Sequence, residues 1–115
     1  MPRVIRVGAA QMGPIQKAES RQAAVRRMLD LLEQARAAKC NLVVYPELTL
    51  TTFFPRWYMT DQAEVDAWFE RDMPNAQTRP LFDKAAEYGI AYIILFIPVV
   101  ALGRFLETRF RWSRA

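Results

Sequence analysis

An amphipathic helical pattern followed at once by an apolar strand pattern most limits what this chain can fold into. Residues 18–39 contain no glycine or proline and are rich in helix formers. Their apolar side chains recur at three- and four-residue steps and are Val25, Met28, Leu29, Leu32 and Ala35. Residues 41–46 (Asn-Leu-Val-Val-Tyr-Pro) then form a short apolar run. Such a run is typical of a strand buried on both faces, against which the helix would pack.

The segments on either side continue the alternation of strands and helices. Residues 4–11 are largely β-branched or small and predict a first strand, which a Gly-Pro step ends. Residues 61–71 and 78–89 predict two more helices, the first with a capping-box-like start and the second ended by a glycine. Residues 90–97 predict a third strand. We therefore expect an α/β fold whose first two strands are parallel and joined by a right-handed crossover.

Length and cysteine content indicate one small domain in a reducing compartment. A chain of 115 residues can form one hydrophobic core, and its single cysteine, Cys40, excludes an internal disulfide. No long apolar segment follows the charges at the N-terminus, so no secretory signal is expected. The cytoplasm is therefore the expected compartment.

The net charge of +4 does not by itself favour nucleic acid as a partner. Residues 103–115 contain four arginines and one acid, so this segment holds +3 of that charge and the rest of the chain is nearly neutral. Proteins that bind nucleic acid usually carry their basic residues across a folded face or along a helix. Residues 90–103 lack charge, but they include a proline and are shorter than the roughly 20 residues of a membrane-spanning helix. Neither nucleic acid nor a membrane is expected as a partner.

Four stretches of the chain resemble one family of enzymes. Residues 41–48 (Asn-Leu-Val-Val-Tyr-Pro-Glu-Leu) resemble the first signature of the nitrilase superfamily of carbon–nitrogen hydrolases. Residues 49–57 (Thr-Leu-Thr-Thr-Phe-Phe-Pro-Arg-Trp) resemble the loop of the N-carbamoyl-D-amino acid amidohydrolases. Residues 7–15 and 79–90 fit the same group. The resemblance covers roughly residues 4–92.

This resemblance implies a fold and a reaction. The fold is an α-β-β-α sandwich, of which residues 1–97 would be an incomplete N-terminal portion. The reaction converts an N-carbamoyl-D-amino acid to the D-amino acid, ammonia and carbon dioxide through a Glu-Lys-Cys triad, without metal or organic cofactor. In such enzymes a cysteine thiolate attacks the carbamoyl carbon and a lysine stabilises the oxyanion. The resemblance also implies a homo-oligomer.

Glu47 is the one triad residue that the resemblance carries over, as general base and general acid. It directly follows the predicted strand, and ligands of open α/β sheets bind at the carboxyl ends of the strands. Its position beside an apolar strand and an aromatic loop leads us to expect a partly desolvated carboxylate. On spacing alone, an acid at a strand end is more often simply solvated.

Aromatic side chains after Glu47 are candidates for binding the substrate. Phe53 and Phe54 could line a pocket there, together with Trp57 and Tyr58, or all four could cover the core. Neighbouring residues of an extended chain face opposite sides, so we expect at most one of the two phenylalanines to reach a substrate.

The chain departs from the family pattern in its other triad positions. The lysines lie in helical patterns, and none fits the motif: Lys17, Lys39 and Lys84. Cys40 lies where the first predicted helix ends, and we expect it to be a small buried residue rather than the nucleophile. Residues 98–115 form a divergent, arginine-rich tail. These departures suggest a truncated or frame-shifted product that is inactive alone.

Two other functions remain open. A non-catalytic fragment could associate with a full-length homologue and modulate it. Alternatively, the basic tail could bind nucleic acid or anionic lipid, in which case binding would fall steeply with salt.

Overall fold

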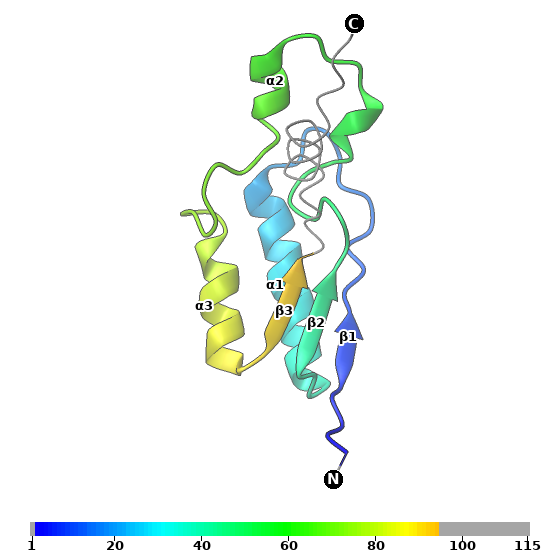
Figure 1. Ribbon diagram of the computed structural model, residues 1–115, viewed down its shortest axis with the longest axis vertical. Coiled ribbons are helices and arrows are strands. Elements are labelled where there is room, and N and C mark those ends of the chain that lie inside the picture. The colour runs from blue at the N-terminus through cyan, green and yellow to red at the C-terminus, as the bar shows by residue number, and fades with distance from the viewer. Residues whose placement is uncertain (1, 95–115) are drawn as a thin grey trace, which may run out of the picture.

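The computed structural model of the chain describes residues 2–94, which form a small parallel sheet with helices packed against it (Figure 1). The strands are β1 (Val7–Ala9), β2 (Leu42–Tyr45) and β3 (Ala91–Ile94). The helices are α1 (Arg21–Ala37), the 3₁₀ turn η1 (Phe54–Arg56), α2 (Gln62–Asp66) and α3 (Arg79–Tyr88). The fold is therefore α/β, as predicted. The proposed boundary at residue 97 and the tail at 98–115 lie outside the described residues.

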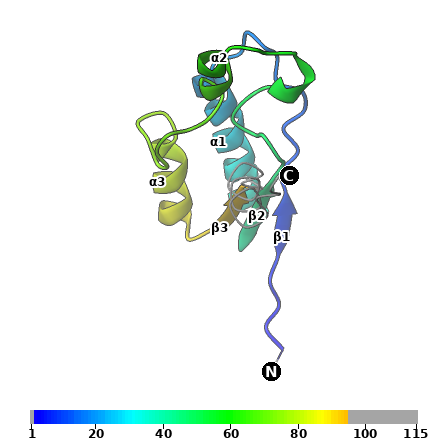
Figure 2. The ribbon, with the colours of Figure 1, turned by 45° about the horizontal axis from the view of Figure 1, so that its top comes forward.

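The sheet has the order β1-β2-β3, and both of its strand pairs are parallel. Val7 pairs with Leu42 in the first ladder, and Val43 pairs with Tyr92 in the second. Helices α1 and α3 connect successive strands and contact each other as well as the sheet. Figures 1 and 2 show the two helices side by side on the same side of the sheet. The parallel pairing that the sequence predicts is confirmed.

The core lies between helices α1 and α3 and strand β2. The buried stripe of α1 consists of Ala24, Val25, Met28, Leu32 and Ala35. On β2 the side chains of Val43 and Tyr45 are buried, and the Tyr45 hydroxyl donates to the Met28 carbonyl oxygen at 2.8 Å. Leu42 and Val44, on the alternate positions, are only half-buried by the described residues. The prediction of a strand buried on both faces is therefore wrong for residues 2–94.

Local signals explain where α1 and α3 begin and end. Ser20 caps α1 by accepting a hydrogen bond from the Ala23 amide at 3.2 Å. Two residues past α1, Lys39 has a φ of 57°, a left-handed conformation that terminates helices. Gly89 ends α3 with a φ of 63°, which a glycine adopts without steric cost. The predicted glycine stop is confirmed, although β1 and α1 are shorter than their predicted ranges.

Helix α2 ends at Asp66, five residues short of the predicted 61–71. Asp61 caps it as expected, accepting from the Ala63 amide at 3.0 Å. The stop has a tertiary cause: Arg21 Nη2 donates to the carbonyl oxygens of Ala67 at 2.8 Å and Phe69 at 3.5 Å. These carbonyl oxygens accept hydrogen bonds from the Arg21 side chain of α1 instead of from backbone amides of a further helical turn.

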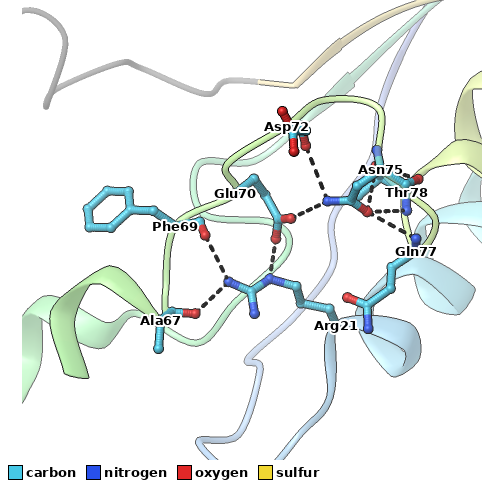
Figure 3. A network of polar contacts seen from close by, with 8 residues as sticks. All are labelled: Arg21, Ala67, Phe69, Glu70, Asp72, Asn75, Gln77 and Thr78. Atoms are coloured by element: carbon cyan, nitrogen blue, oxygen red, sulfur yellow. Dashed lines mark hydrogen bonds and ion pairs between the residues drawn. The ribbon is translucent and has the colours of Figure 1, made fainter. Parts of the chain in front are cut away.

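Loop 67–78, between α2 and α3, is held by a continuous polar network (Figure 3). The Glu70 carboxylate accepts from Arg21 Nε on one oxygen and from Asn75 Nδ2 on the other. Asn75 Oδ1 in turn accepts from the backbone amides of Gln77 at 3.0 Å and Thr78 at 3.1 Å. The network ties the loop to the first turn of α1.

Candidate active site

Glu47 lies at the carboxyl end of β2, two residues after the strand's last residue, Tyr45. Leu48, which follows it, has a φ of 52°. A bulky residue in the left-handed region is uncommon, and such strain is concentrated at functional sites. The Leu48 carbonyl oxygen accepts from the Thr51 amide at 3.2 Å, which closes a tight turn after Glu47.

Glu47 lines a cleft of about 230 Å³ formed by the loops that follow β1 and β2. The loop after β1 contributes Gln11, Met12, Gly13, Pro14 and Ile15. The loop after β2 contributes Pro46, Glu47, Leu48, Thr49, Thr51 and Phe53. Because β1 and β2 are adjacent and parallel, their carboxyl ends meet at one edge of the sheet, where ligands of such folds bind.

The Glu47 side chain is exposed, so the expectation of a partly desolvated carboxylate is wrong for the described residues. The tight turn carries the residue to the rim of the cleft instead of against the apolar strand. Within residues 2–94 its carboxylate forms no ion pair and accepts no hydrogen bond from a side chain or backbone amide. A carboxylate free of partners can accept a proton or a hydrogen bond from a bound molecule.

Phe53 and Phe54 lie in different surroundings. Phe53 is 59% exposed and lines the cleft, whereas Phe54 is 8% exposed and does not line it. Phe54 stacks on Trp68 with ring centroids 5.9 Å apart and meets Phe69 edge-on at 5.3 Å. Of the two, only Phe53 can therefore contact a molecule in the cleft, whereas Phe54 packs the loop against the two aromatic rings of residues 68 and 69.

Trp57 and Tyr58, the other aromatic candidates, do not line the cleft. Lys17 and Arg56 lie over the Trp57 ring, with centroid distances of 5.1 Å and 5.3 Å. Tyr58 is 94% exposed. These residues belong to the outer surface of the loop.

Two threonines in the cleft were not singled out from the sequence. Thr49 is 1% exposed and Thr51 is 9% exposed, and both line the cleft. The hydroxyl oxygen of Thr49 is buried and has no hydrogen-bond partner within the described residues. The available signal was the threonine-rich run directly after Glu47, but sequence alone does not reveal which hydroxyl is left without a partner.

Neither the cysteine nor any lysine of the chain lines the cleft. Cys40 is half-buried before the start of β2, at the opposite end of that strand from Glu47. Its Sγ would lie 3.2 Å from a Cβ on Gly8, so it fills space beside β1. Lys84 pairs with Glu87 at 2.8 Å on the surface of α3. No lysine is part of the cleft wall.

Among residues 2–94, no cluster of three or more His, Cys, Asp and Glu side chains could hold a metal ion. None of the helices in that part of the chain is long and apolar enough to cross a membrane.

Comparison with protein families agrees with the signature around Glu47. The family model described as carbon-nitrogen hydrolase matches residues 6–109. The match includes both loops of the cleft and extends past residue 92, where the resemblance by motif ended. The chain therefore belongs to the carbon–nitrogen hydrolase family, whose members form the nitrilase superfamily.

Proposed function

We propose that the cleft at Glu47 belongs to an active site that hydrolyses the carbon–nitrogen bond of N-carbamoyl-D-amino acids. The observation that carries this proposal is the position of Glu47, in the family signature, at a strand end and in a cleft. The choice of substrate rests on residues 49–57, which resemble the loop of the N-carbamoyl-D-amino acid amidohydrolases.

Glu47 acts as the proton carrier of the reaction. It takes the proton of the cysteine thiol, whose sulfur attacks the carbamoyl carbon, and gives that proton to the departing nitrogen, so that ammonia leaves. It then takes a proton from water, which attacks the thioester carbon and restores the thiol. The N-carboxy product separates into the D-amino acid and carbon dioxide. A triad lysine donates to the oxyanion in both steps.

The surroundings of Glu47 suit this role. An exposed carboxylate that is free of partners among residues 2–94 can exchange protons with a bound substrate and with water. Met12, Ile15 and Phe53 give the cleft an apolar wall against which a substrate side chain can pack.

A polypeptide of these 115 residues alone is expected to release no measurable ammonia. Its lysines and its cysteine do not match the triad positions, and loss of a triad nucleophile costs on the order of a million-fold in turnover. The test is ammonia release from an N-carbamoyl-D-amino acid by the purified chain. Robust release would overturn this expectation.

A gain-of-activity experiment tests the site itself. Residues 1–92 are joined to the downstream part of a family domain that carries the lysine and the cysteine. This fusion protein should release ammonia from N-carbamoyl-D-amino acids. An inactive but folded fusion protein would count against the proposed site.

A second candidate function is association with a full-length homologue or a second copy of the chain. Exposed apolar side chains on and before β1 favour it: Val4 is 89% exposed, Ile5 53% and Val7 54%. Such side chains at a sheet edge promote pairing with another chain. Co-purification with a full-length homologue tests this candidate, and a strictly monomeric chain that captures no homologue would refute it.

A further inference from the structure

We propose that Thr49 is a substrate-binding residue of the Glu47 cleft, whose hydroxyl donates a hydrogen bond to the oxygen of an amide or ureido group. The proposal rests on the function proposed for the cleft, and it adds a residue to which the family triad gives no role.

The first observation is the orphaned hydroxyl. Thr49 is 1% exposed, and its Oγ1 has no hydrogen-bond partner among the described residues. More than nine in ten buried polar groups in proteins have a partner, because an unpaired one costs free energy. A group of this kind requires a hydrogen-bond partner that residues 2–94 do not supply.

The second observation is a matched residue elsewhere in the chain. Thr78 is also 1% exposed, but its Oγ1 accepts from the Asn75 amide at 2.9 Å. At this structural position the fold therefore supplies the buried threonine hydroxyl with a hydrogen-bond partner. Burial alone does not explain the lack of a partner at Thr49.

The third observation is location. Thr49 and Glu47 both line the cleft, and the left-handed Leu48 between them turns the chain. In the apolar part of the wall, the side chains of Ile15 and Phe53 have no acceptor for the hydroxyl, and the thioether of Met12 is only a weak one.

The chemistry of the two polar groups indicates the ligand class. An ionised carboxylate only accepts hydrogen bonds, whereas a threonine hydroxyl can also donate one. An amide or ureido group presents N–H donors and a carbonyl oxygen side by side. Glu47 and Thr49 are complementary to these two ends.

The test combines ligand binding with thermal stability in the full chain. N-carbamoylglycine is titrated into isotope-labelled protein, and backbone resonances of the cleft are followed by NMR. Thr49→Val keeps the side-chain volume but removes the hydroxyl, Thr49→Ser keeps the hydroxyl, and Thr78→Val is the matched stability control.

We expect Thr49→Val to weaken binding about tenfold, the loss of roughly one hydrogen bond, while Thr49→Ser retains most of the affinity. The melting temperature of Thr49→Val should be equal to or above that of the wild type, whereas that of Thr78→Val should be lower. This opposite response separates a binding hydroxyl from a structural one.

The outcomes distinguish this inference from the proposed function. Equal binding by the wild type and Thr49→Val would overturn the role of Thr49 and leave the proposed function standing. A wild-type chain that shows no change in its cleft resonances would count against both. A fall in melting temperature for Thr49→Val, as large as that for Thr78→Val, would show a structural partner and overturn the inference.

Discussion

Two loops of this molecule each contain a glutamate and a buried threonine. The side chains have polar partners in one loop and none among the described residues in the other. In loop 67–78, the 9% exposed side chain of Glu70 is bound by Arg21 and Asn75, and Thr78 accepts from the Asn75 amide (Figure 3). In the loop after β2, Glu47 is exposed and Thr49 is buried. Neither of these two side chains has a polar partner within residues 2–94.

The difference separates polar groups that are bonded within the fold from polar groups that have no partner within residues 2–94, which we propose bind a ligand. Loop 67–78 satisfies its own donors and acceptors, so its polar residues contribute to stability. The loop after β2 keeps a left-handed leucine and an orphaned hydroxyl, both of which cost stability. Proteins tolerate such violations of local rules mainly at functional sites.

The largest expected effect on stability comes from Glu70→Gln. The neutral amide removes the negative charge opposite Arg21. It also places an NH₂ group against one of the two present donors, Arg21 Nε or Asn75 Nδ2, so that one hydrogen bond is lost. The free energy of unfolding should fall by about 2–3 kcal/mol. Urea denaturation measures it, and an unchanged value would break the comparison between the loops.

The two threonines should respond with opposite sign to the same substitution. Thr78→Val leaves the Asn75 amide without its acceptor and should lower the free energy of unfolding by about 1–2 kcal/mol. Thr49→Val removes a hydroxyl that has no partner and should leave the stability unchanged or raise it by up to about 1 kcal/mol. Equal losses at both positions, measured by urea denaturation, would contradict the distinction.

Tyr45 sharpens the comparison, because it is a satisfied hydroxyl on the strand that leads to Glu47. Tyr45→Phe removes the hydrogen bond to the Met28 carbonyl oxygen and should cost about 1 kcal/mol. Burial, reinforced by the neighbouring Tyr92, raises the pKa of Tyr45 far above its ordinary value. The fold thus favours the neutral phenol.

The raised pKa of Tyr45 makes stability depend on alkaline pH. Its contribution is fully present below the unfolded pKa of about 10 and is lost progressively as the pH rises above it. Tyr45→Phe should therefore flatten the decline in stability above about pH 10. Part of the decline should remain, because burial also raises the pKa of Tyr92. An identical alkaline decline in both proteins would refute this assignment.

The smallest effect on stability is expected from Glu47→Gln. The same chemical change that weakens the fold at position 70 should alter the free energy of unfolding by less than about 0.5 kcal/mol at position 47. The reason is that the Glu47 carboxylate has no partner in residues 2–94 to lose. A loss comparable to that of Glu70→Gln would reveal a structural role.

The elements defined by local patterns could be predicted from the sequence. The apolar stripe around Met28 predicted α1, the apolar run at 41–46 predicted β2, and Gly89 marked the end of α3. These signals depend on residues close in the chain. The early end of α2 could not be predicted, because it depends on Arg21, which lies 46 residues before the Ala67 carbonyl.

The candidate site was predicted only in part for the same reason. The signature drew attention to Glu47, which lines the cleft, and the alternation of neighbouring side chains agrees with Phe53, but not Phe54, lining it. The exposure of Glu47 and the orphaned hydroxyl of Thr49 arise from the turn at Leu48 and from packing between two loops. Such features follow from tertiary structure and have no local pattern.

The central claim is that Glu47 acts in catalysis and does not contribute to the stability of the fold. It is tested most directly in the active fusion protein. Ammonia release from an N-carbamoyl-D-amino acid is compared before and after Glu47→Gln. We expect the rate to fall at least about a hundredfold, the usual contribution of a general base, with no change in melting temperature. An undiminished rate in the folded variant would contradict the claim.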